Sequence, residues 1–209
     1  MKIAVVTSDE LRAELLQQGL KEPETVEWFS GVREAVTSGA DACIDLLFTS
    51  HRDEGIKILE EMDVPLVIVE DVTGMSRDLP EKFVRINGWR GFLNRPVVEA
   101  CTRNEINKKR TIEVFSCFNK RTEWVADVPG FITATVISMI INEAYFALEQ
   151  KVSSKQEIDI AMKLGTNYPY GPFEWGGLIG LKNIYSLLTE LSKSDKRYQP
   201  CDLLKKETN

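Results

Sequence analysis

Few side chains in this sequence could do acid–base or metal chemistry by their type and spacing. The chain has one histidine, His51, and four widely scattered cysteines (Cys43, Cys101, Cys117 and Cys201). A single imidazole rules out a metal site built from several histidines. No two cysteines have the spacing of metal ligands, so we expect free, buried thiols and no bound metal. His51 itself follows a predicted strand, and we expect a solvated loop residue there, with a relocated catalytic base as the open alternative.

The turn after the first predicted strand bears on nucleotide binding. Dinucleotide-binding folds place a G-x-G-x-x-G motif there, because glycines let backbone N–H groups approach the pyrophosphate at the helix N-terminus. The corresponding run here, Thr7-Ser8-Asp9-Glu10-Leu11-Arg12, has no glycine. Asp9 and Glu10 would stabilise the helix dipole themselves. The second predicted strand ends in Trp28-Phe29-Ser30, without the acid that holds a ribose hydroxyl. We therefore expect no tight NAD binding and assign no cofactor-binding residue.

Length, composition and charge limit the classes of partner. The chain has 209 residues, of which 43% are hydrophobic and 28% charged, and its formal net charge is −6. This suits a globular protein of one or two domains. Nucleic acid and anionic membranes would not attract an acidic chain, so we expect neither as the main partner. The N-terminus lacks a signal-peptide pattern, and no apolar run approaches the roughly 20 residues of a membrane span. We expect a cytoplasmic protein.

The elements that would position these residues alternate in the first part of the chain. Short β-branched runs predict strands over residues 2–6, 25–29, 43–48, 65–69, 83–86, 97–101 and 122–126. Amphipathic segments predict helices over 7–18, 32–37, 51–62 and 105–118, the first opened by a capping box of Thr7 and Glu10. Alternation of this kind implies βαβ crossovers, and strands without a polar face suit parallel pairing. Residues 1–126 therefore predict a small doubly wound, Rossmann-like, mostly parallel α/β sheet.

After the run Asp127-Val128-Pro129-Gly130 the strand signals stop. A helix is predicted over 131–150, apolar nearly all round its first three turns, so that its own domain or a partner chain must cover several sides. Further helices are predicted over 155–164, 181–191 and 201–205, with a Gly/Pro/aromatic loop over 165–173. Ser154 and Glu157 form a second capping box. Residues 127–209 therefore predict an all-helical C-terminal domain.

Four ordered motifs in this second domain are specific. They are Asp127-x-Pro129-Gly130-Phe131-Ile132, then Asn142-Glu143-Ala144, then Ile158-Asp159-x-Ala161-Met162-Lys163-Leu164-Gly165, and finally Tyr168-Pro169-x-Gly171-Pro172-Phe173-Glu174 followed by Leu178-Ile179-Gly180-Leu181. In order and spacing they resemble the helical domain of the L-3-hydroxyacyl-CoA dehydrogenases. The resemblance covers residues 127–191 well. Upstream it is thinner, although the order of elements agrees, and the first domain is shorter than that of the usual enzyme.

The resemblance implies NAD-dependent oxidation of the 3-hydroxyl group of an acyl-CoA in fatty-acid β-oxidation. The family uses a histidine as general base and a glutamate that orients it. The histidine opens an HFFNP-type segment, and the glutamate lies twelve residues further on. A gapless match of that segment to residues 87–99 places the glutamate on Glu99 and the histidine on Asn87. Because an amide cannot accept a proton at neutral pH, the resemblance implies that the base is lost.

Two further family positions carry polar groups. A substrate-contacting asparagine lies two residues after the PGFI motif, where this sequence has Ala134. A serine beyond the fourth strand contacts the substrate oxygen, and the local match places Thr73 there with its hydroxyl retained. Of four polar groups, Glu99 and Thr73 are therefore kept, and those at Asn87 and Ala134 are replaced. The resemblance also implies an acyl-CoA ligand and a homodimer formed through the helical domain.

Several interpretations stay open at this point. One is a 3-hydroxyacyl-CoA dehydrogenase family protein with lost or strongly reduced NAD-dependent oxidoreductase activity. Another is a non-catalytic dimeric acyl-CoA-binding or protein-interaction module, and a third is a site that another chain completes. Glu99 could equally be a surface carboxylate on a strand. The basic run Lys108-Lys109-Arg110 reads as a solvated helix face, with a site for the CoA phosphates as the alternative.

Overall fold

The computed structural model describes residues 1–21 and 25–208. Their contacts divide the chain into two compact units, Met1–Phe131 and Ile132–Asn209. We call these the sheet unit and the helical unit and describe each by itself. The domain boundary expected between residues 126 and 127 stays a prediction.

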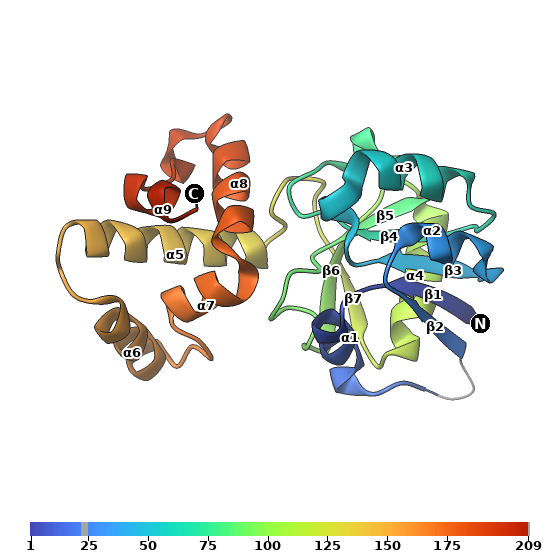
Figure 1. Ribbon diagram of the computed structural model, residues 1–209, viewed down its shortest axis with the longest axis horizontal. Helices are drawn as coiled ribbons and strands as arrows, with labels where there is room; N and C mark the ends of the chain where they lie inside the picture. The colour runs from blue at the N-terminus through green and yellow to red at the C-terminus, as the bar shows by residue number, and fades with distance from the viewer. Residues whose placement is uncertain (22–24, 209) are drawn as a thin grey trace. The chain divides into compact units, whose positions relative to one another are not determined.

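Within residues 1–21 and 25–131, the sheet unit has seven strands in the order β2-β1-β3-β4-β5-β6-β7 (Figure 1). Among these described strands, only the β5–β6 pair is antiparallel. The strand order reverses at β1, so the carboxyl ends of β1 and β3 lie where doubly wound sheets usually bind ligands. The strands are β1 (Lys2–Val6), β2 (Thr25–Phe29), β3 (Ala42–Asp45), β4 (Val67–Glu70), β5 (Phe83–Ile86), β6 (Val97–Cys101) and β7 (Arg121–Trp124).

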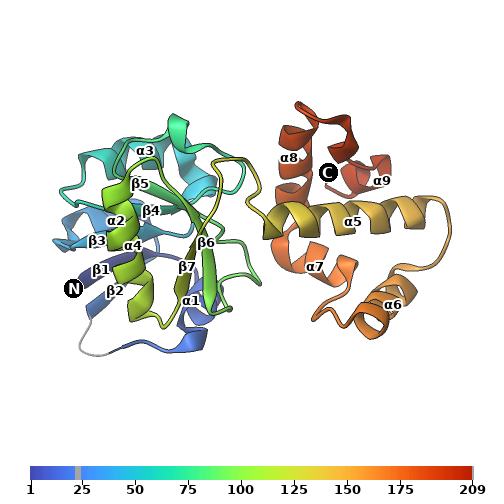
Figure 2. The same cartoon turned by 180° about the vertical axis from the view of Figure 1, so that it is seen from behind.

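Helices cover both faces of this sheet, as Figures 1 and 2 show from opposite sides. Leu15 of α1 and Phe115 of α4 pack in a core beneath one face, and Ala35 of α2 and Leu59 of α3 pack in a core beneath the other. Burial on both faces explains why the strands have no polar face. The predicted doubly wound, mostly parallel sheet is confirmed. The helices are α1 (Asp9–Leu15), α2 (Val32–Ala35), α3 (Arg52–Glu61) and α4 (Glu105–Cys117).

The helical unit is arranged around α5, which packs against α7, α8 and α9 (Figure 1). One side of α5 is buried through Ala134, Ile137 and Ile141, whereas Val136 on another side is half-exposed. Its own unit therefore covers only part of this apolar helix. None of the described helices is long and apolar enough to cross a membrane. The helices are α5 (Thr133–Glu149), α6 (Lys155–Thr166), α7 (Pro172–Ile179), α8 (Leu181–Ser192) and α9 (Asp202–Glu207).

Three local predictions are wrong. The first helix is capped by Ser8, whose hydroxyl accepts the Leu11 N–H, and not by Thr7. The third strand ends at Asp45 instead of residue 48, because the Asp45 carboxylate accepts the Leu47 N–H and turns the chain. The predicted loop over 165–173 ends in an unexpected helix, α7, that begins at Pro172.

Candidate functional site

The two residues matched to the family's histidine–glutamate pair lie just after the end of β5 and within β6. Asn87 follows β5, and its side-chain Nδ2 donates a hydrogen bond to Glu99 Oε2 at 3.1 Å. The Asn87 backbone N–H also donates to the Glu99 carbonyl oxygen at 3.1 Å, which fixes the two residues side by side. Asn87 is buried and Glu99 is partly buried. The structure thus brings together the two residues that the sequence match paired, and Glu99 is not a lone surface carboxylate.

The chemistry of this pair follows from the amide. A neutral Asn87 side chain donates a proton in the hydrogen bond to Glu99, and it has no basic nitrogen that could take one from a substrate. An imidazole at this place could take a proton on one nitrogen while the other faced the carboxylate. The pair can therefore position a polar ligand, but Asn87 cannot act as general base.

Thr73 lies on the loop after β4, and neighbouring residues hold this loop. The Gly74 N–H donates to Asp71 Oδ1 at 3.0 Å, and the Gly130 N–H donates to the Val72 carbonyl at 2.7 Å. Parallel β4 and β5 are neighbours, so the Thr73 loop and Asn87 leave the sheet at the same edge. Thr73 is half-buried at that edge.

An ion pair that the sequence did not suggest fixes the same region. Arg85 of β5 is fully buried, donates to Asp127 Oδ1 at 2.7 Å and stacks on the ring of Phe131. Burial disfavours the charge of Asp127, but the Ser76 N–H and the Arg85 guanidinium together hold its pKa below the ordinary value. The first family motif is thus a structural anchor, because its aspartate binds the arginine within the sheet.

Ala134, the fourth predicted position, belongs to the helical unit. It lies on α5, is fully buried and offers only a methyl group. The structure therefore supplies no polar side chain at this position.

A second group of side chains gathers at the ends of β3 and β4, and we call it the strand-edge cluster. Three buried carboxylates, those of Asp45, Glu70 and Asp71, face the segment 49–52. Thr49 donates to Glu70 Oε2 at 2.6 Å, His51 Nε2 lies 2.8 Å from Asp45 Oδ2, and Arg52 Nε donates to Asp71 Oδ2 at 3.3 Å. One short segment, residues 49–52, therefore contacts the side chains at the ends of two neighbouring strands.

His51 is part of this cluster and not the solvated loop residue that was expected. Its side chain is only 21% exposed and bonds a fully buried carboxylate. The hydrogen bond to Asp45 raises the pKa of His51 above its ordinary value, so the pair favours the charged imidazolium. The Nε2 of His51 faces Asp45 and its Nδ1 lies 3.3 Å from the Ser50 hydroxyl, so both ring nitrogens have a partner within the cluster.

The turn that would hold a dinucleotide does not fit one. The Ser8 hydroxyl binds the backbone of α1 and donates to Glu10 Oε2 at 2.7 Å. That hydrogen bond lowers the pKa of Glu10, which favours a negative charge in the first turn of α1, the helix whose N-terminus would face a pyrophosphate. Within the described residues only β2 lies beyond β1 on this side of the sheet, whereas Rossmann folds carry two strands there. The residues present therefore do not fit NAD.

Two helical motifs are explained by a helix cap and not by a ligand. The Asp159 carboxylate of α6 accepts the Phe173 N–H at 2.8 Å at the start of α7. Glu174 accepts the Gly171 N–H at 2.9 Å and pairs with Lys163. A Cβ atom on Gly171 would lie 2.2 Å from Asp159 Oδ1, so glycine is needed for this close approach. The Gly/Pro/aromatic segment is therefore structural.

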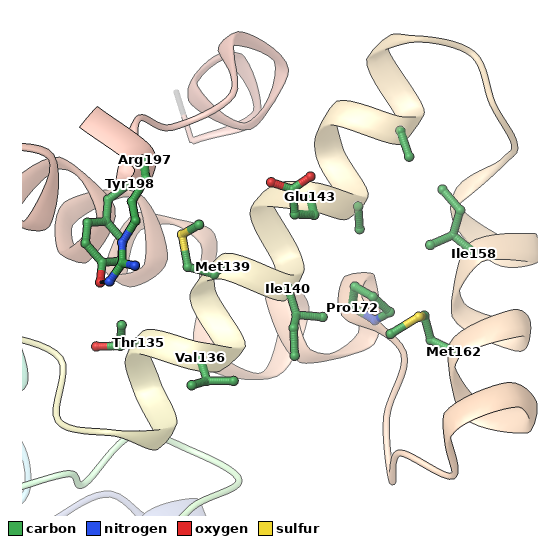
Figure 3. A pocket seen from close by; sticks show the side chains of 12 residues that line it. Thr135, Val136, Met139, Ile140, Glu143, Ile158, Met162, Pro172, Arg197 and Tyr198 are labelled. Atoms are coloured by element: carbon green, nitrogen blue, oxygen red, sulfur yellow. Dashed lines mark hydrogen bonds between the residues drawn. The ribbon is translucent and has the colours of Figure 1, made fainter. Parts of the chain in front are cut away.

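The exposed side of α5 lines an apolar groove within the helical unit (Figure 3). Its volume is about 670 Å³, and only two of its lining residues, Glu143 and Arg197, are charged. Val136 and Met139 project into it from α5 and Met162 from α6. The remaining lining residues are Thr135, Ile140, Ala144, Ala147, Ile158, Pro172 and Tyr198. We call this surface the α5 groove.

The basic run on α4 is engaged locally. Lys108 pairs with Glu105 at 2.6 Å and covers the Trp124 ring, while Arg110 donates to the Pro65 carbonyl. These contacts favour a solvated helix face over a phosphate site.

Comparison with known proteins agrees with this architecture. Residues 130–209 match the family model described as 3-hydroxyacyl-CoA dehydrogenase, C-terminal domain. The 3-hydroxyadipyl-CoA dehydrogenase of Escherichia coli is 48% identical over 39% of this chain and 18% of its own length. The 3-hydroxybutyryl-CoA dehydrogenase of Bradyrhizobium diazoefficiens is 32% identical over 63% of this chain and 46% of its own. The chain thus spans less than half the length of these two relatives.

A solved structure extends the likeness to the sheet unit. The (S)-3-hydroxybutyryl-CoA dehydrogenase from Ralstonia eutropha superposes with a TM-score of 0.76 over 98% of this chain and 92% of that one, at 18% identity. At such identity the likeness concerns the fold alone. The matched family model and the sequence relatives show that residues 130–209 belong to the C-terminal domain of the 3-hydroxyacyl-CoA dehydrogenase family.

Proposed function

We propose that this chain is an acyl-CoA-binding member of its family whose NAD-dependent oxidoreductase activity is lost or strongly reduced. The observation that carries the proposal is the 3.1 Å hydrogen bond from the Asn87 amide to Glu99, at the place of the family's histidine–glutamate pair. The carboxylate and its neighbour are kept in contact, while the proton acceptor is absent. Loss of a general base costs about 10²–10⁴-fold in rate. The turn at Ser8–Glu10, which opposes a dinucleotide, lowers activity further.

Two measurements test this proposal. In a turnover assay with acetoacetyl-CoA and NADH, we expect no rate above the uncatalysed background. In titration calorimetry, we expect heat of binding with 3-hydroxybutyryl-CoA and none with NAD. Turnover at the rate of an ordinary dehydrogenase would contradict the loss of activity, and absence of acyl-CoA binding would contradict the ligand.

The α5 groove favours a second part of the proposal, a homodimer formed through the helical unit. The groove is almost wholly apolar, and exposed apolar patches of this kind mark interaction sites. The groove carries one acidic and one basic residue, Glu143 and Arg197, and charges of opposite sign on one surface can pair across an interface between two copies of that surface. The four cysteines are buried and free of disulfides, which supports a reducing, cytoplasmic location.

A further inference from the structure

One buried carboxyl group of the strand-edge cluster is not accounted for by the proposed function. Glu70 is the last residue of β4 and pairs in register with Ile86 of β5, the residue before Asn87. A Cβ atom on Gly88 would lie 2.7 Å from Glu70 Cγ, so the Glu70 side chain passes directly over the backbone next to Asn87. Gly88 thus leaves room for this carboxyl group beside the Asn87–Glu99 pair.

The two oxygens of Glu70 differ. Oε2 accepts the Thr49 hydroxyl at 2.6 Å, whereas Oε1 is buried and has no hydrogen-bond partner among the described residues. The residue is only 7% exposed. A buried polar atom without a partner costs free energy comparable to a lost hydrogen bond, so a native structure normally keeps one for a purpose.

Within residues 1–21 and 25–208, no cation neutralises Glu70. Among the charged groups around it, Asp45 and Asp71 are carboxylates, and the neighbouring bases are engaged with those two residues. His51 binds Asp45, Arg52 binds the Asp71 carboxylate, and Arg85 donates to the Asp71 carbonyl. Burial, together with the Asp71 and Asp45 charges, raises the pKa of Glu70 to about 7, against the lowering effect of Thr49. The group can therefore exist as an uncharged acid near neutrality.

We propose that Glu70 is a ligand-contacting residue of this site, and that its Oε1 side hydrogen-bonds a carbonyl or hydroxyl oxygen of the bound acyl group. This inference rests on the proposed acyl-CoA binding and names the residue that recognises the oxygen. An uncharged carboxyl group can donate one hydrogen bond, whereas a carboxylate only accepts. Ligand binding and protonation of Glu70 therefore favour each other.

Titration calorimetry of the full chain with 3-hydroxybutyryl-CoA between pH 6 and pH 8.5 tests the inference. We expect the wild-type affinity to fall about 10-fold or more across this range, since deprotonation removes the donor. Glu70→Gln keeps an uncharged donor of the same shape, so its affinity should stay nearly constant across the range. The exposed Glu61→Gln is the matched control and should follow the wild type. Coenzyme A without an acyl group corrects for titration of the phosphates.

A second variant protects the test against a folding defect in the first. Thr49 is exposed and lowers the pKa of Glu70, so Thr49→Val should move the fall in affinity to higher pH. If Glu70→Gln and Thr49→Val both keep the wild-type pH profile while binding persists, Glu70 does not contact the ligand. If wild-type protein binds no acyl-CoA at any pH, the proposed function itself fails, and the two failures are thereby distinguished.

Discussion

The side chain at position 87 is an amide, which has no basic nitrogen. Asn87 keeps the hydrogen bond to Glu99, so the local geometry survives while the basic nitrogen is absent. The amide keeps the contact with Glu99 and offers no proton acceptor, which is the basis of the proposed loss of activity. The neighbouring Arg85–Asp127 ion pair holds the adjoining segments by contacts that do not depend on residue 87.

Restoring the imidazole tests which defect dominates. We expect Asn87→His to leave NADH oxidation with acetoacetyl-CoA at background, because the Ser8–Glu10 turn still opposes the cofactor. Stopped assays with purified protein at neutral pH measure this, with Asn87→Gln as the control that changes size without adding a base. A gain of about 10²-fold or more, the scale of a general base, would mean that the dinucleotide binds despite that turn.

Glu70 also makes a prediction about stability without any ligand. Its pKa in the folded chain, about 7, lies above the ordinary value of 4.5, so the folded state binds more protons between these values. Stability should therefore be greatest below pH 4.5 as far as this group is concerned, and fall as the pH rises to 7. The whole effect is about 3 kcal/mol at most. Denaturant unfolding of wild type and Glu70→Gln at pH 5 and pH 8 measures it.

His51 acts in the same direction in a different window. Because its pKa is raised above 6.5 by Asp45, its contribution is fully present below pH 6.5 and is lost as the pH rises through its folded value. In Glu70→Gln the decline between pH 5 and pH 7 should shrink, while the decline at higher pH persists. An unchanged profile in this variant would show that Glu70 titrates normally.

The sequence predicts part of this site and not the rest. Asn87 and Glu99 could be paired because a family segment spans both with a fixed spacing. Glu70 could not be singled out from the sequence. The pKa of its carboxyl group depends on Thr49 and on the charges around it, and its position depends on Gly88. The fold alone brings these residues together. His51 was misjudged for a related reason, since ending β3 at Asp45 places its carboxylate within reach of the imidazole.

At the level of elements, the junction of α6 and α7 depends on one close approach. A Cβ atom at Gly171 would lie 2.2 Å from Asp159 Oδ1, so Gly171→Ala must displace the carboxylate that caps α7. We expect a loss of about 1–3 kcal/mol in the free energy of unfolding. Gly177→Ala in the same helix is the control, since nothing lies within 4 Å of that position. It should be neutral or stabilise by up to about 1 kcal/mol.

Thermal and denaturant unfolding of both variants would decide this. Equal free energies of unfolding for the two variants would contradict a capping role for residues 171–174. Those residues would then again be candidates for contact with a ligand.

The same helix shows where element prediction fails. Two capping boxes were predicted, and the one at Ser154 and Glu157 is confirmed, because its partners lie three residues apart on one segment. The start of α7 has a local contact, from the Gly171 N–H to Glu174, and a second one from Asp159 on another helix, and its Gly176-Gly177 pair lowers local helix propensity. A sequence pattern within one segment cannot predict a capping residue that lies on another helix.

For the whole molecule, the long-range order of strands followed from simple rules. Alternating strands and helices with buried, non-alternating strands allow few arrangements besides a doubly wound sheet, and that sheet is present. The strand pairing around β6, antiparallel on one side and parallel on the other, did not follow from those rules. The oligomeric state could not be predicted either, because the sequence of an apolar helix does not show whether its own chain or a second copy covers it.

The α5 groove makes that last question testable. Val136 is 51% exposed and stands in the first turns of α5, so Val136→Asp adds a charge to the groove at little cost to folding. If a second copy buries this side chain, an unpaired carboxylate there should weaken association by about 2 kcal/mol or more, roughly 30-fold in Kd. Ile106→Asp is the matched control, since Ile106 is 64% exposed near the start of α4. Light scattering across a dilution series should show a dimer for wild type and for Ile106→Asp, and a monomer for Val136→Asp at the same concentration. A monomeric wild type, or a Val136→Asp dimer as tight as the control, would mean that the groove serves another occupant.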